Sequence, residues 1–244
     1  MTFQGNQGGG IGQPVDQTQR INGVDVRAGA QAQGAFLTQA FFWMFAGLLV
    51  TAAIATFVQF NPSLQLLVAD YWIVLIIGQL GLAIGIQALI GRISATLALG
   101  LFFVFAATLG LTVGVVVGLY RIESVGAAFL SASAMFGGAA LYGYTTKRSL
   151  ASIGGFASMA VLGLFVAMIV NVFLGSGPIG FIISIVGVIL FTILTAWDVQ
   201  RINSGQLVQQ TGSVEKAAVI GALHLYLDFV NIFLFLLRLM GGRR

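Results

Sequence analysis

The chain of 244 residues has no cysteine, a single histidine and only 7% charged residues. Without thiols it can form no disulfide, thiolate nucleophile or zinc–thiolate site. One histidine and seven acidic residues leave few ligands for a metal. The net charge of +4 comes without basic residues interleaved with aromatic ones, so we expect no nucleic-acid partner. Hydrophobic residues make up 58% of the chain and the mean hydropathy is +1.00, which predicts a polytopic membrane protein.

Seven apolar segments follow one another, and each has the ~20 residues with which a helix crosses ~30 Å of hydrocarbon. None shows the ten-residue alternation of an outer-membrane strand, so we predict an all-α bundle of seven transmembrane helices. Short connections make neighbouring spans antiparallel. The segments are Ala35–Val58, Tyr71–Ile90, Ser94–Leu119, Val125–Thr145, Leu150–Leu174, Pro178–Val199 and Ala217–Met240.

Residues 1–34 are rich in Gly, Gln and Asn and too polar to bury a core, so we predict a disordered cytoplasmic tail before a single domain at 35–244. The distribution of cations sets the orientation, because cytoplasmic segments carry an excess of Lys and Arg. With the N-terminus inside, Arg121, Arg243 and Arg244 fall outside. The cytoplasmic segments then hold seven cations: Arg20, Arg27, Arg92, Lys147, Arg148, Arg201 and Lys216. This bias predicts a membrane protein with its N-terminus in the cytoplasm and its C-terminus outside, surrounded by lipid. The pattern suits a bacterial inner membrane.

Small residues recur at four-residue spacing in two spans, at Gly110, Gly114 and Gly118 and again at Gly81 and Gly85. Such spacing lets helix backbones approach closely. The sequence favours packing within one chain and leaves dimerisation open.

The last span carries Asp228 near its middle, where a carboxylate costs at least ~2.5–3.5 kcal/mol of insertion free energy. His224, Asp228, Asn231 and Arg238 follow at i, i+4, i+7 and i+14, which predicts one polar stripe facing protein or water. Asn231 and His224 are candidates for lining a pore, and His224 is also a candidate proton relay. A hydrogen bond between His224 and Asp228 that only holds the bundle together is the alternative.

A second acid, Asp198, lies one turn inside the predicted cytoplasmic end of the sixth span, and Arg92 ends the second span on the same side. Two carboxylates within ~4 Å repel by ~4 kcal/mol at an effective dielectric of ~20. They would share a proton near neutral pH and titrate as a pair. If Arg92 bound the ionised form, the site would be a pH-dependent latch. As alternatives, Asp198 pairs only with Arg201 at i+3, or the two acids lie at different depths and meet only if a helix tilts or shifts.

Enzyme classes fit poorly. The Gly-x-Gly-Asp signature of aspartyl intramembrane proteases is missing, since LYL precedes Asp228. No rhomboid-like serine motif accompanies His224, the last span has no inner lysine for retinal, and no phosphate-binding glycine loop is present. We therefore expect neither catalysis nor a cofactor.

Four motifs carry a family resemblance: GLTVG at 110–114, GYTTKRSL at 143–150, WDVQRI at 197–202 and LYLDFVNIFLFLLRLMG at 225–241. With them the chain resembles the Bax inhibitor-1 family, in its bacterial form, from about Ala35 to the end. The resemblance implies six helices around a central seventh and a pH-sensitive calcium leak. It also implies an Asp198–Asp228 sensor and Arg92 as its arginine partner.

The second span departs from some bacterial members, since it holds Gln79 and Gln87 but no acid. The resemblance also leaves a second function open, because other relatives modulate a membrane-bound AAA protease. We therefore carry two hypotheses. One is a calcium leak channel gated by Asp198, Asp228 and Arg92, in which the two acids could contact passing Ca²⁺. The other is a non-channel regulator that binds a membrane AAA protease or another stress-response partner.

Overall fold

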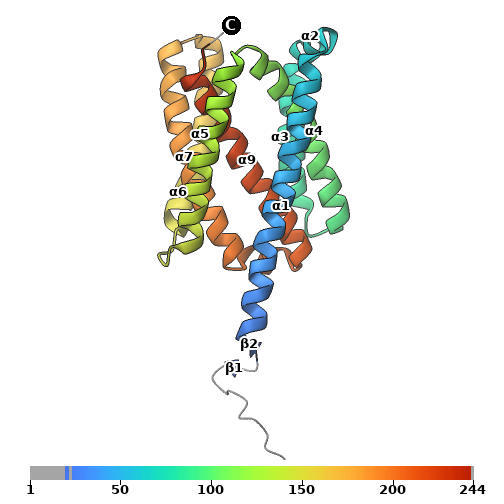
Figure 1. Ribbon diagram of the computed structural model, residues 1–244, viewed down its shortest axis with the longest axis vertical. Helices are drawn as coiled ribbons and strands as arrows, with labels where there is room; N and C mark the ends of the chain where they lie inside the picture. The colour runs from blue at the N-terminus through green and yellow to red at the C-terminus, as the bar shows by residue number, and fades with distance from the viewer. Residues whose placement is uncertain (1–19, 22–23, 243–244) are drawn as a thin grey trace, which may run out of the picture.

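The computed structural model describes residues 20–21 and 24–242, and side chains from Phe36 to Gly242. Two antiparallel strands of two residues each, β1 (Arg20–Ile21) and β2 (Val24–Asp25), precede the helices. The described helices, drawn in Figure 1, are α1 (Val26–Gln59), α2 (Pro62–Asp70), α3 (Trp72–Leu89), α4 (Ala95–Gly118), α5 (Ile122–Thr145), α6 (Ala151–Leu174), α7 (Gly177–Asn203), α8 (Gln206–Thr211) and α9 (Val214–Met240).

The prediction of seven apolar spans is confirmed. Seven of the described helices, α1, α3, α4, α5, α6, α7 and α9, are long and apolar enough to cross a membrane. Their ends differ from the predicted ones by a few residues, except that α1 begins at Val26, inside the predicted tail. Residues 1–19 of that tail lie outside the described part, so its disorder stays a prediction. The sequence analysis also missed the short helices α2 and α8, whose lengths of 9 and 6 residues are too small for a periodicity to show.

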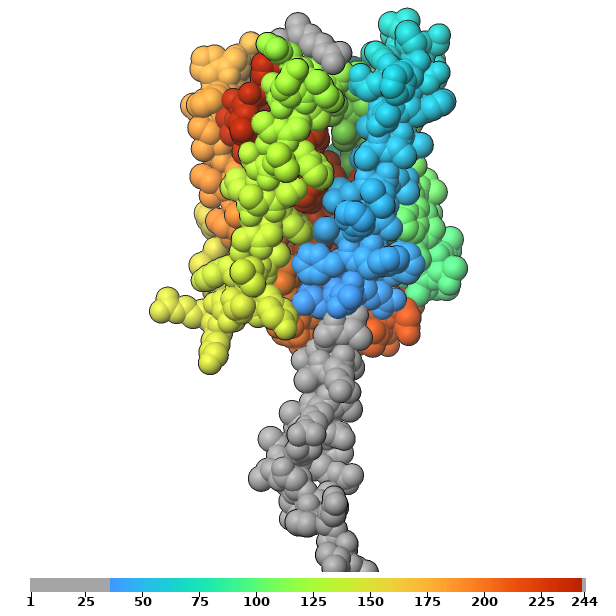
Figure 2. Space-filling model, in the orientation of Figure 1, coloured from blue at the N-terminus to red at the C-terminus, as the bar shows by residue number. Residues whose placement is uncertain are grey.

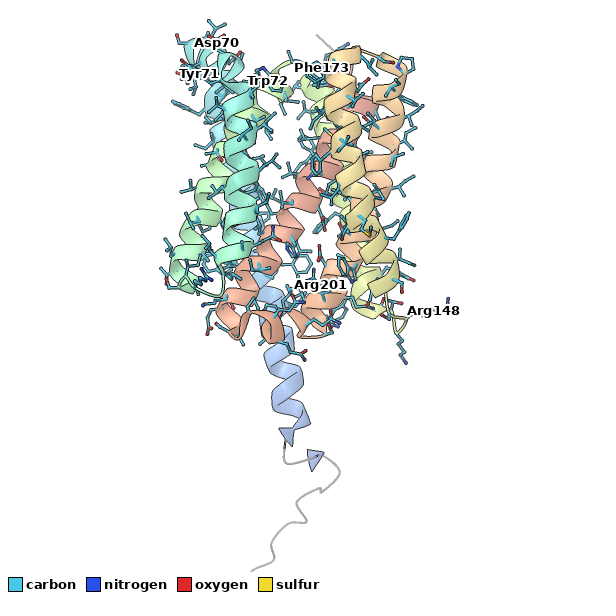
Figure 3. The ribbon with its side chains drawn as sticks, turned by 180° about the vertical axis from the view of Figure 1, so that it is seen from behind. Asp70, Tyr71, Trp72, Arg148, Phe173 and Arg201 are labelled. Carbon is cyan, nitrogen blue, oxygen red and sulfur yellow. The ribbon has the colours of Figure 1, made fainter. Side chains whose placement is uncertain are left out.

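The two ends of the bundle differ in their side chains. The chain enters at one end, which we call the N-terminal end, and leaves at the other, the C-terminal end (Figure 1). Arg148 and Arg201 lie at the N-terminal end, whereas Asp70, Tyr71, Trp72 and Phe173 lie at the C-terminal end (Figure 3). The labelled basic and aromatic residues thus lie at the two ends of the apolar middle, as in helices that meet both membrane–water interfaces (Figure 3). The predicted cytoplasmic side corresponds to the N-terminal end.

Helix α9 is the central element, as predicted. Of its most apolar 18-residue window 78% is buried inside the protein, against 56% for α7 and 17–33% for the other spans. It packs on α1, α5 and α7 and runs obliquely through the bundle (Figure 1). Helix α6 packs mainly on α7, so the surrounding helices do not all contact α9 to the same extent. The oblique course lets a residue near the middle of α9 meet the end of α7.

Helices α1 and α4 pack closely through the glycines of α4. A methyl group on Gly110 would lie 2.9 Å from the carbonyl oxygen of Thr51, and one on Gly114 would lie 3.0 Å from that of Ala55. This confirms packing within one chain for these two positions. A methyl group on Gly81 or Gly85 of α3 would meet nothing within 4 Å. The four-residue spacing of these two glycines therefore does not mark a helix contact within the chain.

Candidate functional site

Two buried acids meet where α7 and α9 cross. Asp198 lies five residues before the end of α7 and is 6% exposed, and Asp228 lies in the middle of α9 and is 3% exposed. Their carboxyl groups are neighbours. The sequence allowed the two acids to meet only if a helix tilted or shifted, and α9 does run obliquely through the bundle (Figure 1). The role of the two acids as a sensor stays a prediction.

Arg201 holds the Asp198 carboxylate. Its Nη1 donates to Asp198 Oδ1 at 2.9 Å, and both side chains are largely buried. The guanidinium group also stacks on the ring of Trp197, 4.6 Å from its centroid, and Nη2 donates to Gln210 Oε1 of α8 at 3.2 Å. A charged pair with this many contacts joins the end of α7 to the short helix that leads into α9.

His224 lies near the same oxygen of that carboxylate. Its Nδ1 is 3.4 Å from Asp198 Oδ1 but makes no hydrogen bond, and its Nε2 lies 3.0 Å from Gln87 Oε1 of α3. The amide nitrogen of Gln87 donates to Ala83 O at 3.2 Å, so the oxygen faces the ring and Nε2–H donates to it. Nδ1 then presents a lone pair to a carboxylate, unless the ring takes up a second proton. His224 thus contacts Asp198, not Asp228 as the sequence suggested.

Asp228 has a less complete set of partners. The side chain of Thr195, one turn before Asp198 on α7, lies beside it, and its hydroxyl donates to the carbonyl oxygen of Phe191 at 2.8 Å. The carboxylate oxygen Oδ2 is buried and has no hydrogen-bond partner. An isolated ionised carboxylate in such a place is costly, whereas a protonated carboxyl group is much less so. We call Asp198, Arg201, His224 and Asp228 together the acid cluster.

The predicted polar stripe of α9 divides in two. Its less buried face comprises Leu227 and Leu234 together with His224, Asn231 and Arg238. Asp228 is wholly buried instead. At 100° per residue its direction is ~80° from the middle of that face, enough to point it into the bundle. Asn231 donates to the carbonyl oxygen of Leu227 on its own helix at 2.8 Å, and Arg238 lies against Gly180 of α7. Neither reaches the acid cluster.

Among the residues that the structure describes, no three His, Asp or Glu side chains are grouped closely enough to hold a metal ion.

Known proteins place the chain in a family. A family model described as "Inhibitor of apoptosis-promoting Bax1" matches residues 33–244. The chain belongs to the Bax inhibitor-1 family. It is 39% identical over 227 residues to inner membrane protein YbhL of Escherichia coli (strain K12), a match that covers 91% of this chain and 96% of that protein. It is 40% identical over 209 residues to an uncharacterised protein of Deinococcus radiodurans, covering 85% and 90% of the two chains.

A third relative, an uncharacterised protein of Borreliella burgdorferi, is 36% identical over 214 residues and covers 86% of this chain and 92% of its own. The matches run along nearly the whole length of each relative. This Bax inhibitor-1 family chain is therefore an integral membrane protein with seven apolar spans, similar over most of its length to a bacterial inner membrane protein.

In this family member Arg92 does not hold the place that the resemblance implied. Arg92 is exposed in the turn between α3 and α4 and, within the described part of the chain, forms no ion pair within 4.0 Å. Arg201 occupies the position against Asp198, because it lies one helical turn away on the same face of α7. The alternative weighed from the i, i+3 spacing is the arrangement that the structure shows.

Sequence reasoning missed two further residues of the acid cluster's surroundings. Thr195 is three residues before Asp198, so the helical spacing could have placed it on the same face. Gln87 comes from α3, and no spacing in the sequence relates it to His224. Its contact depends on how α3 and α9 are placed in space.

Proposed function

We propose that this protein is a pH-sensitive leak channel for cations, with Ca²⁺ as the transported ion, and that the acid cluster is its sensor. The observation that supports this most is the burial of two carboxylates on separate helices, one of which is paired with an arginine. Ionisable groups at membrane depth are expensive and commonly serve ion or proton movement. Family membership makes a channel role plausible and leaves the ion, the gating and the residues to be tested.

Charge balance explains how the acid cluster would respond to protons. Asp198, ionised and paired, neutralises Arg201. The buried carboxyl group of Asp228, with Oδ2 unpartnered, is least costly when protonated, so the acid cluster then has no net charge. A further proton, on Asp198, gives it a net positive charge in a low-dielectric interior, which destabilises the closed arrangement.

The arginine provides the mechanical link. Once Asp198 loses its charge, the Nη1 contact at 2.9 Å no longer has an ionised acceptor. Arg201 is also bound to Gln210 on α8, so its release frees the segment between α7 and α9. We infer that the N-terminal part of α9 then shifts and opens a path beside the two acids, which could contact Ca²⁺ in passing. On this mechanism acidic pH opens the channel.

Calcium flux into vesicles tests the proposal. Purified protein in vesicles loaded with a calcium-sensitive dye should pass Ca²⁺ faster as the pH falls. In Asp228→Asn and Asp198→Asn the dependence on pH should flatten, because the amide cannot bind the proton that the carboxylate does. Flux is measured at fixed Ca²⁺ from acidic to neutral pH for each variant.

The control is Arg92→Gln, which should keep the wild-type pH profile, since Arg92 makes no ion pair with either acid. Flux no greater than in empty vesicles would overturn the channel proposal. The regulator hypothesis would then be examined by deleting residues 1–30 and asking whether a protease partner is lost.

His224 offers a separate test. His224→Phe removes the ring nitrogen that lies 3.4 Å from Asp198 Oδ1, while the ring of Phe fills similar space. We expect the flux to fall more gradually with rising pH, because the Asp198 carboxylate loses a polar neighbour. The steepness of the flux–pH curve is the measurement. An unchanged steepness would show that the imidazole only helps to hold α3 through Gln87.

A further inference from the structure

An apolar groove separates α1 from α5 on the face shown in Figure 2, where α1 is blue and α5 is yellow-green. The groove contains a cavity of about 240 Å³. One wall is formed by Phe45, Leu49 and Ala52 of α1, the other by Phe129 and Ser133 of α5, and Phe229 of α9 lies at its floor. These positions fall in the middle of their spans, so the groove opens sideways at the depth of the hydrocarbon.

The lining offers nothing that would retain water. Ser133 is its one hydroxyl-bearing residue, and that hydroxyl already donates to the carbonyl oxygen of Phe129 at 2.8 Å. A buried water needs two to four polar partners, and apolar cavities stay dry. An empty groove would leave its walls without van der Waals partners. The occupant must therefore be apolar.

The rim of the groove is continuous with the lipid-facing surface of the spans. Phe45, Leu49 and Phe129 are 58%, 56% and 49% exposed in the protein, and each lies in a helix that crosses the membrane. The hydrocarbon that covers these side chains has direct access to the cavity. A helix of a second copy has a diameter of about 10 Å, so it would cover the groove without entering it.

We propose that the groove between α1 and α5 binds one acyl chain of a membrane phospholipid. A cavity of about 150 Å³ holds a benzene molecule, so this one has room for several methylene groups of a lipid tail. The chain would end against Phe229, whose ring packs edge-on against Phe129 and Phe136 at centroid distances of 5.6 and 5.5 Å. Phe229 follows Asp228 on α9, so the bound tail lies one residue from the acid cluster. The proposal does not depend on channel activity.

Photocrosslinking tests the site. The full chain is placed in bilayer nanodiscs with a phosphatidylethanolamine that carries a diazirine near the end of one acyl chain, then extracted into detergent, washed free of bulk lipid and irradiated. Peptide mass spectrometry locates the adducts. We expect the retained lipid to label the groove residues of α1 and α5. In Ala52→Phe the new ring fills the groove, and labelling there should fall by at least about tenfold.

Ala53→Phe is the matched control, because Ala53 is also exposed, is the next residue of α1 and does not line the groove. It should keep the labelling. Ser133→Phe fills the groove from the opposite wall and repeats the test if Ala52→Phe fails to fold. Labelling after the wash that is no stronger in the groove than on the exposed face of α6 would overturn the proposal. So would undiminished labelling in both filled variants, or crosslinks between two copies across the groove.

Discussion

Replacing Arg201 by glutamine should destabilise the protein by about 3 kcal/mol, the usual cost of removing one partner of a buried ion pair. The variant leaves the Asp198 carboxylate buried beside Asp228, with the His224 ring nitrogen 3.4 Å away in place of the guanidinium charge. It also removes the contact with Gln210 and the stacking on Trp197. Unfolding by SDS titration of the protein in mixed micelles measures the loss.

The comparison with Arg92 makes this prediction specific. Arg92→Gln removes the same charge from an exposed side chain with no ion pair in the described structure, so its effect should stay within about 0.5 kcal/mol. The double variant Asp198→Asn/Arg201→Gln should recover much of the stability, because no charge is then left unpaired. Equal losses for the two arginine variants would mean that Arg92 shares the role of Arg201.

Gly143→Ala should cost about 2–3 kcal/mol through overpacking. A methyl group at this position of α5 would overlap the carbonyl oxygen of Ala196 on α7. Backbone cannot rotate away as a side chain can, so the two helices must separate. Ala196 is two residues before Asp198, and the separation should also disturb the acid cluster. We therefore expect both a lower unfolding midpoint and altered fluorescence of Trp197.

The same helix provides the control for this variant. Gly138→Ala places an identical methyl group where nothing lies within 4 Å. It should be neutral or stabilise the helix by up to about 1 kcal/mol, the difference in helix propensity between glycine and alanine. The difference between the two variants, measured in the same titration, isolates the close contact of α5 with α7. Equal stabilities would show that this contact can relax without cost.

The acid cluster shows where sequence reasoning succeeded and where it stopped. The position of Asp228 within an apolar span marked it as a functional candidate, and the WDVQRI motif did so for Asp198. The arginine was harder to assign, because Arg92 and Arg201 both come at the same predicted side of the membrane. An ion pair one turn apart on a single helix needs no tertiary arrangement, whereas a contact of Arg92 with Asp198 does. The structure contains the local pair.

The amino-acid sequence by itself determined the seven helices, their alternating direction and the family. These follow from the length of apolar runs and from local motifs, which do not depend on distant parts of the chain. Only the tertiary structure decided that α9 crosses the bundle obliquely, that His224 reaches Asp198 and Gln87 and that Asp228 turns inward. Each of these depends on how one helix is inclined to another, and the packing of all the side chains together fixes that angle.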